Sequence, residues 1–137
     1  MNILFIHGLF GSPTNWYRTI QVLMDNQLWT SEDAIYSIQL PIDDYVIRDH
    51  NTFGGIESLT EYVEAYINQR GITDVIVVGN SLGGQVAIDY TVKNQHNVKG
   101  LVLTGSAGLR ERAINGEGAK VNNGYAAIEG IAAEIFY

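Results

Sequence analysis

The stretch that decides the fold reads Val75-Ile76-Val77-Val78-Gly79-Asn80-Ser81-Leu82-Gly83-Gly84. It begins with a β-branched run that has no polar alternation, which is typical of a strand buried on both faces. The Gly79-x-Ser81-x-Gly83 pattern then predicts a cramped turn from this strand into a helix. Glycines flank the serine because the backbones of the strand and the helix approach too closely there for side chains. The Ser81 hydroxyl is expected to project above the carboxyl end of the sheet, where ligands bind in such folds.

The helix after this turn adds a second chemical feature. It is predicted over Leu82–Lys93, so its free N–H groups and its positive dipole end face the serine. Such donors stabilise the negative oxygen that forms when a hydroxyl attacks a carbonyl group. We therefore predict Ser81 as a nucleophile and the backbone N–H of Leu82 as one oxyanion donor. Gly79 and Gly83 are expected to be structural at this site.

A second motif, His7-Gly8-Leu9-Phe10-Gly11, lies at the end of the first predicted strand. If that strand neighbours the serine strand, its loop can bring a second oxyanion donor to the site. The Leu9 N–H is the first candidate for this donor and the Phe10 N–H is the next. We expect His7 and Gly8 to be structural, with His7 pinning the loop through hydrogen bonds rather than acting as a base.

Apolar runs and helical periodicity alternate along the chain. The predicted strands are Asn2–Ile6, Ala34–Leu40, Asp74–Val78 and Lys99–Thr104. Helices are expected after an N-cap at Ser12, over Ile56–Ile67 with Gly71 as C-cap, and over Leu82–Lys93 with Val86, Ala87 and Tyr90 buried. The alternation predicts the α/β class, with a doubly wound parallel sheet of about four strands and flanking helices.

Composition is typical of one globular domain. The 137 residues are 46% hydrophobic and 17% charged, as in an ordinary folded core. The net charge of −7 disfavours nucleic acid and anionic membranes as partners. The absence of cysteine excludes disulfides and thiolate metal sites. There is no basic leader before His7 and no apolar run of about 20 residues, so we expect a cytoplasmic protein.

Together the two motifs resemble the α/β-hydrolase superfamily, in particular its small serine esterases and its carbon–carbon bond hydrolases. The resemblance rests on Ile3–Ser12, Val75–Gly84 and Val98–Gly105. It implies that residues 1–108 are the N-terminal part of a hydrolase core and that 109–137 are the start of a cap or a C-terminal helix. The order of the strands that it implies is 34–40, 2–6, 74–78, 99–104.

The last strand in this order has no outer neighbour. Its edge is apolar and lacks the proline or inward charge that blocks pairing with other strands. We expect a complementary polypeptide, a second copy of this chain, or the amphipathic helix predicted over 126–137 to cover it. Family members continue with a strand that bears an Asp and a strand that is followed by a His. The chain is therefore expected to be the N-terminal portion of a longer or split hydrolase.

The resemblance requires a histidine and an acid after the serine, and no such pair is identified in this chain. His96 lies near the far end of the helix that starts at Ser81, roughly 20 Å away at about 1.5 Å per residue. His50 lies in a polar loop, where it is either solvent-exposed or able to swing over the site. The remaining acids considered are interpreted as loop charges and not as triad or metal-binding groups: Glu111, Glu117, Asp43 and Asp44.

The sequence thus predicts a serine hydrolase that acts on a small-molecule substrate, an ester or a related carbonyl compound, without a cofactor or a metal. Its base and acid are expected from segments outside this chain. The alternative is a non-catalytic binding or assembly module of hydrolase ancestry. A nucleotide-binding protein is disfavoured because the glycine turn lacks both Gly-x-Gly-x-x-Gly and the P-loop Gly-Lys-Ser/Thr ending.

Overall fold

A computed structural model describes residues 1–29, 34–42, 55–107 and 132–136. The elements follow in the order β1 (Asn2–Ile6), η1 (Pro13–Trp16, a short 3₁₀ helix), α1 (Tyr17–Asp25), β2 (Ile35–Ile38), α3 (Gly55–Arg70), β3 (Val75–Asn80), α4 (Leu82–Lys93), β4 (Val98–Thr104) and β5 (Ala132–Phe136). The five described strands form one sheet in the order β2-β1-β3-β4-β5, with every neighbouring pair parallel. The predicted order of the first four strands is confirmed.

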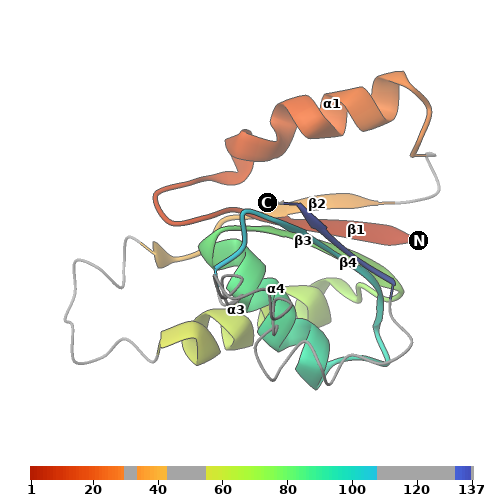
Figure 1. Ribbon diagram of the computed structural model, residues 1–137. Coiled ribbons are helices and arrows are strands. Elements are labelled where there is room, and N and C mark those ends of the chain that lie inside the picture. Colours follow the sequence, from red (N-terminus) through yellow and green to blue (C-terminus); the bar gives the residue numbers. More distant parts are fainter. Residues whose placement is uncertain (30–33, 43–54, 108–131, 137) are drawn as a thin grey trace, which may run out of the picture.

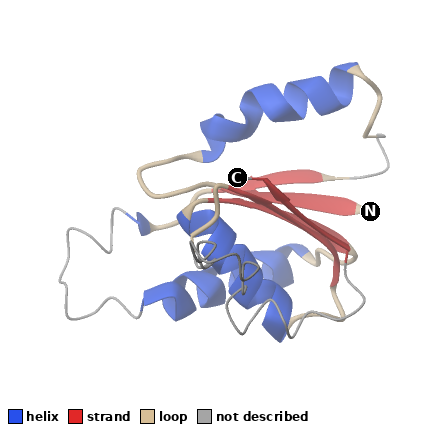
Figure 2. Ribbon diagram, viewed as in Figure 1, coloured by secondary structure: helices blue, strands red, loops and turns tan. Residues whose placement is uncertain are grey.

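Helices cover both faces of this sheet, as the doubly wound prediction requires. Figures 1 and 2 show α1 over one face and α3 with α4 over the other. Side chains of β1 alternate between the two layers. Leu4 and Ile6 enter the larger core with α3 and α4, whereas Ile3 and Phe5 enter the smaller core beneath η1 and α1. In the smaller core the rings of Phe5 and Trp16 lie 5.0 Å apart between centroids.

The helices end and pack as the sequence predicts. Gly71 follows α3 with φ 61°, its N–H donates to Asn68, and the N–H of Ile72 donates to Ile67. This is the Schellman arrangement, which a glycine in the left-handed region allows at no steric cost. On α4 the predicted face is buried, with Val86, Ala87 and Tyr90 each at most 1% exposed. Within the described ranges, no helix has both the length and the apolar character that a bilayer crossing requires.

The register of the strands brings the two sequence motifs to one edge of the sheet. Gly79 of β3 is aligned with Ile6 of β1 on one side and with Leu103 of β4 on the other. The strands are parallel, so their carboxyl ends meet there. The loop that starts at His7, the serine turn and the end of β4 therefore converge.

The prediction for the end of the chain is wrong over residues 132–136. These residues form β5, parallel to β4, with Ala132 aligned to Gly100 and Phe136 to Thr104. They do not form part of an amphipathic helix. Pairing with β4 satisfies backbone N–H and C=O groups of β4 that would otherwise lack hydrogen-bond partners. This gain outweighs the helical preference that the spacing of the apolar residues indicates. β5 is then the edge strand of the described sheet, and a complementary polypeptide or second copy beside it stays a prediction.

Candidate active site

Ser81 is the residue at which β3 turns into α4. It is the N-cap of α4, with φ 51° and ψ −119°, and it is exposed. A positive φ in a residue that carries a Cβ costs on the order of 1–3 kcal/mol and persists only where the surroundings hold the backbone. The structure therefore presents an accessible serine on a strained backbone at the beginning of a helix.

Gly79 and Gly83 allow α4 to pack directly on the strand ends. A Cβ on Gly83 would overlap the carbonyl oxygens of Ile6 and His7. A Cβ on Gly79 would overlap the backbone of the first turn of α4. The nearest atoms are backbone in both cases, so no side chain could move aside. Close packing, and not a positive φ, requires glycine at these two positions.

The loop after β1 reaches the same point. The N–H of Gly11 donates to the carbonyl of Gly8 over 3.0 Å and closes a turn in which Phe10 has φ 60°. A Cβ on Gly8 would lie 3.1 Å from the Cβ of Ser81, so the loop backbone packs against the serine. Leu9 and Phe10 are exposed beside this contact, at 47% and 84%.

Backbone N–H groups near Ser81 remain free to bind a ligand. Those of Leu9 and Phe10 donate to no acceptor within the described part of the chain. The N–H of Leu82 belongs to the first turn of α4, where a helix leaves its N–H groups without intrahelical partners. These are the groups that the sequence pattern predicts as oxyanion donors.

His7 is 1% exposed, and both of its ring nitrogens are engaged. Its Nδ1 lies 2.7 Å from the carbonyl oxygen of Gly8, and its Nε2 lies 2.9 Å from the backbone nitrogen of Leu40. Because Nε2 accepts from that N–H, Nδ1 carries the proton that is donated to Gly8. The imidazole therefore ties the loop after β1 to the segment after β2, and neither nitrogen is left to take a proton from Ser81.

Replacing His7 by Phe is expected to lower the free energy of unfolding by about 1–3 kcal/mol, the usual cost of one unsatisfied buried group. The buried Leu40 N–H would lose its acceptor, whereas the Gly8 carbonyl would keep the N–H of Gly11. Urea unfolding measures the loss. His96→Phe is the matched control and should change stability by no more than about 0.5 kcal/mol, since His96 is exposed. Equal losses in the two variants would contradict this account of His7.

The other groups considered as base or acid do not join Ser81 in the described structure. His96 is exposed beyond the end of α4, at the opposite end of that helix from Ser81. Several residues lie outside the described residues: His50, Asp43, Asp44, Glu111 and Glu117. Among the residues that the structure describes, no cluster of three or more His, Asp or Glu could hold a metal ion.

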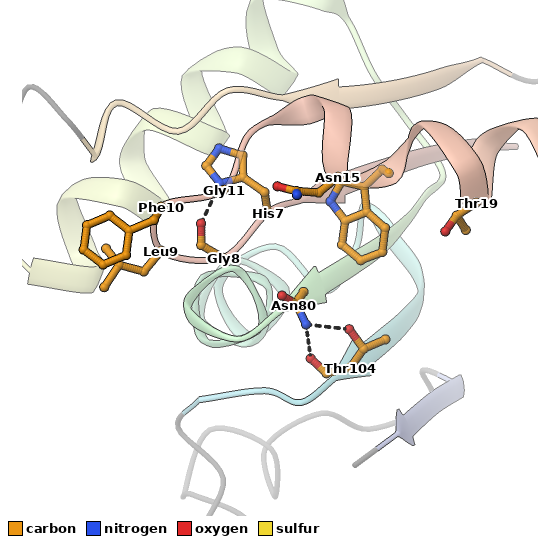
Figure 3. Close-up of a pocket in the computed structure, with 10 residues that line it drawn as sticks. His7, Gly8, Leu9, Phe10, Gly11, Asn15, Thr19, Asn80 and Thr104 are labelled. Carbon is orange, nitrogen blue, oxygen red and sulfur yellow. Dashed lines mark hydrogen bonds between the residues drawn. The ribbon is translucent and has the colours of Figure 1, made fainter.

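A pocket of about 390 Å³ opens beside the serine turn. Its lining is made of the residues His7, Gly8, Leu9, Phe10, Gly11, Asn15, Trp16, Thr19, Asn80 and Thr104. Figure 3 shows Leu9 and Phe10 at one side, Thr19 at the other, and Asn80 with Thr104 across from Asn15. No carboxylate or cationic lysine or arginine side chain is among the lining residues. The pocket is a space for a small molecule between uncharged amides, hydroxyls and apolar side chains.

Apart from His7, the polar residues of this pocket were not predicted from the sequence. Asn80 occupies the variable position of the Gly-x-Ser-x-Gly pattern, and Thr104 ends the next strand in the sheet. Their side chains meet because the register aligns Asn80 with Thr104. A polar residue at the last position of each of two neighbouring parallel strands is the signal that could have found them.

Comparison with known proteins agrees with this geometry. The chain matches the alpha/beta hydrolase family over residues 3–134. It is 29% identical over 116 residues to 2-hydroxy-6-oxo-2,4-heptadienoate hydrolase from Pseudomonas putida, covering 83% of this chain and 40% of that enzyme. It is 28% identical over 115 residues to the dihydrolipoyllysine-residue acetyltransferase component of the acetoin cleaving system of the same species, covering 84% of this chain and 29% of that protein.

A solved structure shares the fold. MGS-MChE2, an alpha/beta hydrolase enzyme from the metagenome of lagoon sediments at Mar Chica in Morocco, superposes with a TM-score of 0.62 at 27% identity. The match covers 81% of this chain and 47% of that protein. The chain thus spans less than half the length of each of these relatives. The family match over nearly the whole chain, the parallel sheet and the strained serine turn together establish that this chain belongs to the alpha/beta hydrolase family.

Proposed function

We propose that this chain carries the nucleophile and the oxyanion site of a serine hydrolase that acts on an ester or a related carbonyl substrate. The observation that carries the proposal is the exposed Ser81 at φ 51°, at the start of α4 and against the Gly8 backbone. The hydroxyl oxygen of Ser81 attacks the carbonyl carbon of the substrate. The N–H groups of Leu82 and of Leu9, or Phe10 in place of Leu9, donate to the oxygen that becomes negative.

A serine hydroxyl attacks efficiently only when a base takes its proton. In the described residues His7 is committed to other hydrogen bonds and His96 lies beyond the far end of α4. The base and its orienting acid therefore come from residues outside the described ranges, or from a complementary polypeptide. Without them, oxyanion binding alone would leave only a residual rate enhancement.

The relatives support a carbonyl substrate but no narrower class. Their names describe a hydrolase of an oxo-dienoate and an acetyltransferase. Both substrates present a carbonyl carbon to a nucleophile. The uncharged lining of the pocket beside Ser81 favours a neutral part of the substrate at that place, because a buried charge there would find no partner.

A fluorophosphonate probe, which phosphonylates activated serines, tests the proposal. We expect covalent labelling of the full chain at Ser81, located by peptide mass spectrometry, and acceleration by added imidazole, which can act as the base that the described residues do not supply. Ser58→Ala, at a half-buried position of α3 away from the serine turn, is the matched control and should label at the wild-type rate. Folded protein that stays unlabelled at Ser81 with and without imidazole would contradict the proposal.

The non-catalytic alternative is favoured by one observation, the lack of an unengaged histidine near Ser81 in the described residues. A binding or assembly module of hydrolase ancestry would hold its ligand or partner equally well after Ser81→Ala. Calorimetric titration of both proteins with the same ligand distinguishes the two functions.

A further inference from the structure

The end of β4 holds the serine turn on both sides of Ser81. The N–H of Ser81 donates to the carbonyl of Thr104 over 3.2 Å. The carbonyl of Ser81 accepts from the N–H of Ala107 over 2.9 Å. Both peptide groups that flank the strained residue are therefore fixed by β4 and by the turn that follows it.

The side chain of Asn80 also binds the end of β4, at Thr104, and we call this contact the clamp. The Nδ2 of Asn80 donates to the carbonyl oxygen of Thr104 over 2.9 Å and contacts the Thr104 hydroxyl over 3.0 Å, as Figure 3 shows. The carbonyl of Thr104 can only accept, so the amide must present its NH₂ group to β4. The Thr104 carbonyl oxygen thus accepts two hydrogen bonds, one from the side-chain amide of Asn80 and one from the backbone N–H of Ser81.

We infer that Asn80 and Thr104 are positioning residues that hold the Ser81 hydroxyl in its reactive place. The inference rests on the proposed function of Ser81 as a nucleophile. The backbone of Ser81 is strained, and such strain persists only while the surrounding contacts over-determine it. Without the clamp, the turn relaxes and the hydroxyl moves away from the oxyanion donors. A displacement of about 1 Å costs a reaction on the order of 10²-fold in rate.

The first test compares two asparagines that make the same kind of bridge. Asn97 donates from Nδ2 to the carbonyl of Ile72 and to the hydroxyl of Tyr90, both over 3.1 Å, at the amino-terminal end of β4 and away from the serine turn. Both Asn80→Ala and Asn97→Ala should lower stability. Only Asn80→Ala should slow fluorophosphonate labelling of Ser81 in the full chain, by about 10²-fold, while Asn97→Ala should stay within about two-fold of wild type.

Asn80→Asp tests the hydrogen-bond donor role of Asn80 through the pH dependence of labelling, which a loss of packing alone would not change. A charged carboxylate cannot donate to the Thr104 carbonyl, whereas a protonated one can. The labelling rate of this variant, divided by the wild-type rate at each pH, should therefore rise as pH falls from about 7 toward about 4, near the ordinary carboxyl pKa. His7 is the one titratable side chain among the residues that line the pocket. Dividing the variant rate by the wild-type rate removes any effect of His7 on labelling, because both proteins contain it.

Amide hydrogen exchange separates this inference from the proposed function. Asn80→Ala should speed exchange of the Ser81 N–H by at least about ten-fold relative to Asn97→Ala, whether or not Ser81 reacts with the probe. If wild-type Ser81 is never labelled, the proposed function fails and the exchange rates still test the clamp. Wild-type labelling of Asn80→Ala, equal slowing in the two alanine variants, or a pH-independent ratio for Asn80→Asp would each overturn the inference.

Discussion

Ser81→Gly is expected to make the protein more stable while it removes all covalent labelling at this position. Relief of the positive φ at Ser81 should return about 1–3 kcal/mol, because glycine populates that region freely. The greater freedom of glycine in the unfolded chain takes back about 0.5–1 kcal/mol. The net gain in the free energy of unfolding is then about 1 kcal/mol, measurable by urea denaturation.

Two variants control this result. Ser81→Ala also removes the hydroxyl and abolishes labelling, but it keeps a Cβ at the same φ, so its stability should match wild type. Ser58→Gly makes the same exchange within α3 and should lose about 0.5–1 kcal/mol. If Ser81→Gly loses stability as Ser58→Gly does, the backbone of Ser81 is not strained and this account of the turn is wrong.

Gly83→Ala is expected to cost about 3 kcal/mol or more in unfolding free energy. The added methyl group would overlap the Ile6 and His7 carbonyl oxygens, and backbone atoms of a central strand cannot yield as a flexible side chain can. Either α4 shifts away from β1 or the chain fails to fold. Circular dichroism during heating, together with urea unfolding, measures the loss.

Gly71→Ala is the matched control for this substitution. Gly71 has φ 61°, but no heavy atom lies within 4 Å of the position that the new methyl group would take, so the change strains only the backbone. It should cost about 1–2 kcal/mol, the usual penalty of a left-handed residue with a Cβ. A cost at Gly83 no larger than the cost at Gly71 would show that α4 has room to move at the serine turn.

Local pattern was sufficient to predict the elements that surround the serine. The apolar run before Gly79 and the glycines after it specify β3, the turn and α4, because each requirement concerns neighbours in the chain. The end of α3 at Gly71 was predictable for the same reason. The order of the first four strands came from the family resemblance, and the sheet confirms it.

Contacts between distant residues were not predictable in this way. Residues 132–136 read Ala-Ala-Glu-Ile-Phe, and so short an apolar segment fits a strand as well as a helix turn. The unpaired backbone groups along the edge of β4 favour the strand. The bridge from Asn80 to Thr104 joins residues 24 positions apart and depends on strand register, which the sequence pattern leaves open by a residue or more.

The hydrogen bonds of Ser81 with Thr104 and Ala107 limit when, during synthesis of the chain, the serine turn can adopt its final shape. A nascent chain that has emerged from the ribosome only as far as α4 already contains the serine, but the hydrogen bonds of Ser81 with Thr104 and Ala107 cannot yet form. The bend can take its final shape only once the chain up to Ala107 has been synthesised and β4 has docked. The strained backbone conformation of Ser81 is therefore held from both sides only after β4 has joined the sheet.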